Sequence, residues 1–164
     1  MKFLIIKIGD RNYGLPITLV REILEDINFT PVQKAPEDIV GLMNVRGQII
    51  TVLSPGVRLG GSPPSGENQE HRTIVLKRND DLDEVSFSLG GQQGTSEELY
   101  AIIIDGVGTV FDADEEALES IPSNTPPEET SFLTGIARVD DLVLPILKVH
   151  KLTEAPGSQL TETA

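Results

Sequence analysis

The sequence contains one strand–turn–strand pattern twice, and this repeat limits the possible folds more than any other feature. Residues 44–53 read NVRGQIITVL, and residues 138–147 read RVDDLVLPIL. In the same register Gly41 matches Gly135, and aliphatic residues follow each bend at equivalent positions. A short bend between aliphatic segments is typical of a β-hairpin. We therefore expect two hairpins, the first turning through a three-residue bend at residues 45–47.

The repeat extends upstream of the hairpins. The matched pairs are Phe3–Lys7 with Thr73–Lys77, Tyr13–Leu15 with Tyr100–Ile102, and Val20–Ile23 with Val107–Val110. Each half therefore predicts five short strands. Strands this short cannot bury their aliphatic faces in an open sheet, whereas closure into a small barrel buries them and removes exposed edges.

The fold class that we predict is all-β, with two small five-stranded barrels packed together and one or two short helices. One domain covers residues 1–152, with halves of roughly 13–70 and 71–152 that share the first strand. Residues 153–164 form a polar tail. The groove between the barrels is the natural place for a partner.

Several segments are less regular. The segment 19–27 fits either a helix or a strand, because its aliphatic spacing suits both. Pro36 followed by two acids indicates the first turn of a short helix. Residues 54–72 have the composition of a loop, and residues 78–98 form an acidic, uneven connection.

The charge of the chain excludes several kinds of partner. Among its 164 residues, 26 acidic side chains outnumber 13 basic ones, giving a net charge of −13. Nucleic acids and anionic membranes are therefore poor partners. The chain has no cysteine, and its apolar N-terminal run is too short for a signal peptide or a membrane span. These features predict a soluble, cytoplasmic protein.

No pattern in the sequence predicts catalysis, a cofactor or a metal. The two histidines, His71 and His150, lack the spacing of a metal site and lie in an expected loop and terminal position. Residues 90–94 lack the Gly-Lys-Ser/Thr of a phosphate-binding loop. A sensor remains the alternative, with a small molecule in the inter-barrel groove or a cation at the acidic 78–98 loop.

Four segments of the chain resemble the CheW family, the adaptors of bacterial chemotaxis. They are FLIIKIGDRNYGLPITLVREIL at 3–24, IVGLMNVRGQIITVL at 39–53, YAIIIDGVGTVF at 100–111 and FLTGIARVDDLVLPILKVHKL at 132–152. The four follow the family's order and span nearly the whole domain. The chain departs from the family's pattern at Thr51, at Ser54-Pro55 and in the longer 78–98 connection.

The resemblance implies two intertwined five-stranded barrels of SH3-like style and a non-catalytic coupling role. Such adaptors bind the regulatory domain of a CheA-type histidine kinase and the cytoplasmic tip of a methyl-accepting chemoreceptor, in chemotaxis or a related motility pathway. Matching positions give the partner-binding residues as Val20, Glu22, Gly41, Arg46, Val107 and Val110. Since the second hairpin carries Asp140-Asp141 where the first carries Arg46-Gly47, only the first hairpin can offer a cationic contact.

Overall fold

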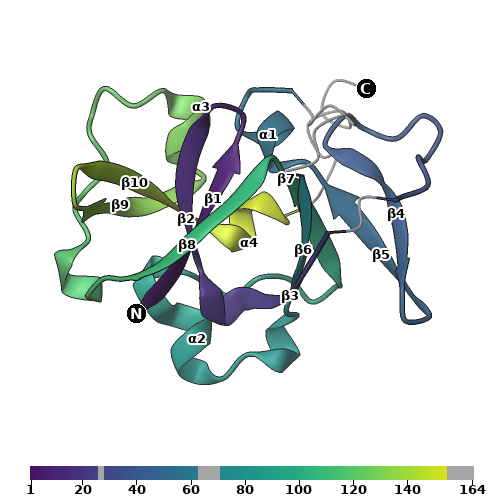
Figure 1. The fold of residues 1–164 in the computed structure, drawn as a ribbon, viewed down its shortest axis with the longest axis horizontal. Coiled ribbons are helices and arrows are strands. Elements are labelled where there is room, and N and C mark those ends of the chain that lie inside the picture. Colours follow the sequence, from purple (N-terminus) through teal and green to yellow (C-terminus); the bar gives the residue numbers. More distant parts are fainter. Residues whose placement is uncertain (26–27, 63–70, 155–164) are drawn as a thin grey trace.

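The computed structural model describes residues 1–25, 28–62 and 71–154, and its ten strands form two five-stranded sheets (Figure 1). Sheet A has the order β8-β1-β2-β10-β9, and sheet B has the order β3-β6-β7-β5-β4. The strands are β1 (Lys2–Ile8), β2 (Arg11–Pro16), β3 (Val20–Leu24), β4 (Ile39–Val45), β5 (Gln48–Leu53), β6 (Arg72–Leu76), β7 (Tyr100–Ile104), β8 (Gly106–Asp112), β9 (Leu133–Val139) and β10 (Leu142–Leu147). The all-β prediction, with five strands in each half, is confirmed.

The two halves of the sequence exchange strands. Sheet A combines β1 and β2 with β8, β9 and β10, while sheet B combines β6 and β7 with β3, β4 and β5. Each sheet therefore holds two strands of one half and three of the other. The boundary between the two sequence halves, near residue 70, therefore does not coincide with a boundary between the two sheets.

The repeat is visible in the strand register as well. A parallel contact joins Gly14 of β2 to Ile146 of β10, and the equivalent contact joins Ala101 of β7 to Val52 of β5. The edge strands β3 and β8 each gain one residue relative to their partner, between Val20 and Glu22 and at the equivalent place in β8. Sequence equivalence thus corresponds to structural equivalence, strand by strand.

Several strands are buried on both faces, which explains their unbroken aliphatic runs. In β7, Ala101 and Ile103 belong to a cluster with Met43 and other residues of sheet B, whereas Ile102 and Ile104 face a central core. That central core also takes residues from both sheets and from a short helix, α4 (Val149–Leu152). Figure 1 shows α4 between the two sheets, with the β9–β10 and β4–β5 hairpins at opposite ends of the molecule.

The helices are short and more numerous than predicted. Besides α4 they are α1 (Pro55–Arg58), α2 (Glu84–Ser88) and α3 (Pro127–Thr130), with 3₁₀ turns η1 (Ile17–Leu19), η2 (Asn79–Asp81), η3 (Leu89–Gly91) and η4 (Glu115–Ala117). The prediction of a loop throughout 54–72 is wrong at its start, because the hydroxyl of Ser54 caps α1, accepting the Val57 N–H at 3.3 Å. Residues 63–70 lie outside the described part of the chain.

Two further segment predictions are decided by tertiary contacts. Segment 19–27 contains β3, so the strand reading is correct for its described residues, and residues 26–27 lie outside them. The helix predicted after Pro36 is absent: the Ile39 N–H closes a turn on the Pro36 carbonyl, and β4 begins there. Pro16 ends β2, as its missing N–H requires. Residues 155–164, most of the expected polar tail, are not described.

Candidate partner-binding site

Arg46 stands at the tip of the β4–β5 hairpin in a backbone conformation that most residues avoid. Val45 pairs with Gln48, so the loop contains only Arg46 and Gly47, with φ of 51° and 85°. The predicted three-residue bend is therefore wrong by one residue. Positive φ at both loop positions matches the twist of the flanking strands, and the Asn44 side chain accepts the Gly47 N–H at 2.9 Å.

Arg46 forms a two-pronged ion pair with Glu22 of β3. Its Nη1 lies 2.6 Å from one carboxylate oxygen and its Nη2 lies 2.9 Å from the other. The planar guanidinium matches the carboxylate in this arrangement. The hydrogen bonds from Arg46 lower the pKa of Glu22, and Glu22 in turn raises the pKa of Arg46. Because β3 and β4 are the outermost strands of sheet B, this pair joins the two edges of the sheet.

The strands at this end of sheet B carry both the charged pair and exposed aliphatic side chains. The Arg46 side chain is 74% exposed, and that of Glu22 is 21% exposed. Ile23 of β3 and Ile49 of β5 are also exposed, at 41% and 62%. Val20, at the start of β3, is half-buried and packs against the central core. This end of sheet B could bind a surface that offers both apolar groups and hydrogen-bonding polar groups.

Val107 and Val110 lie on β8, the edge strand of sheet A. They are 37% and 46% exposed, and they pair with Ile6 and Leu4 of β1. Through the repeat they occupy the positions of Val20 and Ile23. The six expected partner residues are thus divided between the sheets, and the direct contact that the structure brings about among them is the Arg46–Glu22 pair.

Gly41 is buried and has no side chain to offer to a partner. A Cβ at this position would lie 2.5 Å from the Thr30 carbonyl oxygen. Thr30 exchanges two backbone hydrogen bonds with Leu42, at 2.7 and 2.8 Å. Gly41 therefore allows the preceding loop to add an antiparallel bridge beside β4. Among the expected partner-binding residues, Gly41 therefore supports the hairpin and offers no side chain to a partner.

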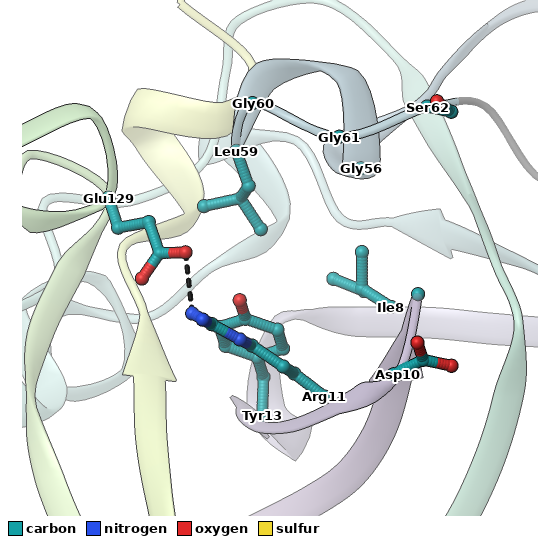
Figure 2. A pocket seen from close by; sticks show the side chains of 11 residues that line it. Ile8, Asp10, Arg11, Tyr13, Gly56, Leu59, Gly60, Gly61, Ser62 and Glu129 are labelled. Atoms are coloured by element: carbon teal, nitrogen blue, oxygen red, sulfur yellow. Dashed lines mark hydrogen bonds and ion pairs between the residues drawn. The ribbon is translucent and has the colours of Figure 1, made fainter. Parts of the chain in front are cut away.

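A cavity of about 290 Å³ lies where the β1–β2 turn faces α1. Figure 2 shows the side chains that line it. Arg11 and Glu129 of α3 form an ion pair at 2.6 Å across it. Burial, followed by the charge of Glu129, raises the pKa of the neighbouring Tyr13. None of the six expected residues lines this cavity. This cavity is therefore lined by side chains other than those expected to bind a partner.

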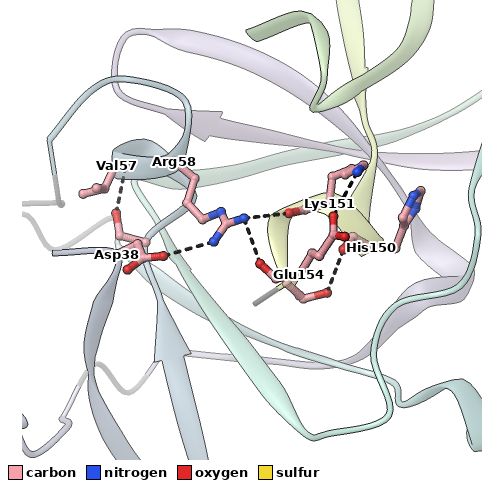
Figure 3. Close-up of polar contacts among 8 residues, drawn as sticks. Asp38, Val57, Arg58, His150, Lys151 and Glu154 are labelled. Carbon is pink, nitrogen blue, oxygen red and sulfur yellow. Dashed lines mark hydrogen bonds and ion pairs between the residues drawn. The ribbon is translucent and has the colours of Figure 1, made fainter. Parts of the chain in front are cut away.

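Arg58 is a buried cation that sequence reasoning did not single out. Its guanidinium lies 3.1 Å from an Asp38 carboxylate oxygen and donates to the carbonyls of Lys151 and Glu154 at 3.0 and 2.9 Å (Figure 3). It also lies over the Phe132 ring, 5.6 Å from the centroid. Arg58 thus links α1 of one repeat to the equivalent helix α4 of the other. These contacts account for Arg58 as a structural residue.

His71 lies outside the strands, as the sequence suggested, but it is buried instead of exposed. It precedes β6, its side chain is 1% exposed, and its Nε2 lies 3.4 Å from Asp105. Asp105 also accepts the Gly9 N–H at 2.7 Å, so this polar group ties the β1–β2 turn to the start of β8. Within the residues that the structure describes, no group of three or more acidic or histidine side chains is placed to hold a metal ion. No helix in that part of the chain is long and apolar enough to span a membrane.

Comparison with known proteins gives consistent matches along the chain. The profile of the CheW-like domain family matches residues 2–156. A chemotaxis protein CheW from Klebsiella aerogenes is 24% identical over 161 residues, covering 98% of this chain and 86% of that protein. Another from Helicobacter pylori is 22% identical, covering 93% and 81%. The crystal structure of the scaffolding protein TtCheW from Thermoanaerobacter tengcongensis superposes with a TM-score of 0.74 at 29% identity, covering 95% of this chain and 89% of that one.

Proposed function

Since this chain belongs to the CheW-like domain family, we propose that it couples chemoreceptors to a CheA-type histidine kinase as a non-catalytic adaptor in the cytoplasm. The family match over nearly the whole chain and the names of its relatives support a role as an adaptor in chemotaxis signalling. The receptor and kinase contacts are the finer part of the proposal. Both contacts are proposed on surfaces that bind a partner without catalysing a reaction.

The receptor contact is proposed at the Arg46 end of sheet B. The observation that carries this proposal is the two-pronged Arg46–Glu22 pair, which holds an exposed guanidinium at a fixed place at the tip of the β4–β5 hairpin. A helical receptor tip offers apolar side chains on one face and carboxylate or amide oxygens beside them. Aliphatic contacts would supply affinity, and Arg46 would fix the register through charge-assisted hydrogen bonds.

The kinase contact is proposed at the exposed edge of sheet A. Val107 and Val110 present aliphatic side chains on β8, which pairs with β1 on one side and is the last strand of the sheet on the other. A domain with a similar edge strand could pack against these side chains. This assignment keeps the two partners on different sheets, so that both can bind at once.

The test is a titration of the full chain against a receptor-tip fragment and a kinase regulatory domain from the same cell. We expect Arg46→Glu to weaken receptor binding about tenfold or more and to leave kinase binding unchanged. The double variant Glu22→Arg/Arg46→Glu restores the internal ion pair with its direction reversed. It should remain defective if Arg46 itself contacts the receptor, and recover if the pair only shapes the hairpin. If the wild type bound neither partner, the proposal would be refuted.

A further inference from the structure

The acidic 78–98 connection is an ordered element with its own anchoring contacts. Gln92 is buried, donating to the Leu147 carbonyl at 2.7 Å and accepting the Val149 N–H at 2.9 Å. Thr95 is also buried, and its carbonyl accepts the Thr153 hydroxyl at 3.0 Å. Leu82 packs against the central core. The connection is therefore fixed to the β10–α4 junction and to the core between the sheets.

This anchoring leaves apolar side chains of α2 facing solvent. In α2, Val85 is 68% exposed and Phe87 is 40% exposed. The Phe87 ring covers Gly94, where an added Cβ would come within 2.5 Å of the ring. Because residues two apart in a helix do not face the same side, Phe87 packs toward Gly94 while Val85 remains exposed beside a groove.

The groove beside α2 is lined by Glu84, Val85, Ser88, Leu89 and Glu115 and has a volume of about 390 Å³. We call it the acidic groove. Its apolar lining comes from Val85 and Leu89, and its two glutamates come from different segments of the chain. An occupant must therefore satisfy carboxylates and aliphatic groups together.

The surrounding sequence has a strong charge bias. Residues 78–98 contain six acidic side chains and one arginine, and residues 112–119 contain five acidic side chains and no lysine or arginine. Asp83 caps α2 through a 2.7 Å bond from the Ser86 N–H, which lowers the pKa of this carboxyl and keeps it charged. A potential of this sign repels phosphates, anionic lipids and a second copy of a chain whose net charge is −13.

We propose that the acidic groove docks a basic, amphipathic segment of a partner protein, as a surface separate from the receptor and kinase contacts. Apolar side chains of the segment would pack on Val85 and Leu89, while its lysines or arginines would face Glu84 and Glu115. Complementary charges would accelerate encounter and make binding dependent on salt. The apolar contacts would decide how long the complex lasts.

The experiment uses ¹⁵N-labelled full chain and a short helix-forming peptide of leucine and lysine as the probe. We expect shifts confined to the amides of residues 80–89 and 115, and binding that weakens as salt rises. Val85→Ser should weaken binding severalfold, whereas Val143→Ser, which removes another exposed valine from the β9–β10 hairpin, should not. Glu84→Gln/Glu115→Gln should weaken binding more than Glu37→Gln/Glu128→Gln, which removes the same charge elsewhere.

Three results would overturn the docking site. Equal losses in the test and control variants would reduce the binding to general charge attraction. Shifts spread over all acidic surfaces would do the same. Shifts at α2 caused by raising the concentration of the protein alone would make a second copy the occupant. The Val85→Ser variant should still bind receptor and kinase fragments, so failure here and failure of the coupling role are distinguishable.

Discussion

At the scale of single residues, two glycines show how the repeat is preserved for a geometric reason. Gly41 and Gly135 each lie where a neighbouring backbone approaches closely, since an added Cβ would be 2.5 Å from the Thr30 oxygen and 2.9 Å from the Glu119 oxygen. In both places the neighbour forms an isolated antiparallel bridge to the residue after the glycine. The glycines that set the register in the sequence are therefore required by the same contact in each sheet.

Alanine at these glycines should destabilise the protein because backbone, unlike a flexible side chain, cannot move aside. We expect Gly41→Ala to lower the free energy of unfolding by about 1–3 kcal/mol, and Gly135→Ala to have a smaller effect of the same sign. Urea unfolding of the purified variants measures this. Gly106→Ala is the matched control, since its Cβ would meet only the Lys7 side chain at 3.8 Å. A Gly41→Ala variant as stable as this control would contradict the argument.

The Glu22–Arg46 pair predicts a specific dependence of stability on pH. Because hydrogen bonding from Arg46 lowers the pKa of Glu22 in the folded state, the folded pKa lies below the unfolded one. The stabilisation is then fully present above the ordinary carboxyl range and is lost as pH falls through the folded pKa. Arg46→Asn, which suits the positive-φ turn, should be less stable than wild type at neutral pH.

That difference between wild type and Arg46→Asn should shrink to nothing on acidification through the folded pKa of Glu22. Urea midpoints of both proteins across the acid range, with an NMR titration of the Glu22 carboxyl, provide the measurement. A constant difference at all pH values would mean that the arginine acts through the turn and not through the ion pair.

At the scale of elements, the strands could be predicted from the sequence but their partners could not. The aliphatic runs at 2–8 and 100–104 correspond to β1 and β7 because both faces of these strands are buried. The exchange of strands between halves leaves no trace in local periodicity, since Gly14 and Ile146 pair across the length of the chain. Similarly, the resemblance could propose Glu22 and Arg46 as partner-binding residues, whereas their mutual ion pair depends on the sheet geometry.

The 78–98 connection shows the same limit most clearly. Its acidic residues and glycines predicted an uneven loop. They gave no sign of the buried Gln92 side chain, whose amide fixes the element to its neighbours. Gln92→Ala removes a donor to Leu147 and an acceptor for Val149. Because both backbone groups then lack their partner in a buried place, we expect a loss of about 2 kcal/mol in unfolding free energy.

Hydrogen exchange should locate the effect of Gln92→Ala at the Val149 amide, where protection falls relative to wild type. The neighbouring Gln93 is exposed, so Gln93→Ala should match wild type in both stability and exchange. If Gln92→Ala also matched wild type, water would be substituting for the amide, and the connection would be held mainly by Leu82 and Thr95.

At the scale of the whole molecule, the exchange of strands makes the two barrels one folding unit. The central core takes side chains from both sheets, and Arg58 adds hydrogen bonds between the helices that follow β5 and β10. Neither sequence half contains a complete sheet. A partner that binds one sheet would therefore act on a molecule in which the other sheet cannot unfold independently.

Cutting the chain between α1 and β6 tests this unity directly. We expect fragments 1–66 and 67–164 to lack cooperative unfolding when separate, because each holds strands whose sheet partners lie on the other fragment. Mixed and refolded together, they should recover the circular dichroism of the intact chain and unfold in one transition. Intact protein nicked at the same place after folding is the control, and it should stay assembled on size exclusion. Cooperative unfolding of either fragment alone would show that one barrel can form from a single half, and the argument from strand exchange would fail.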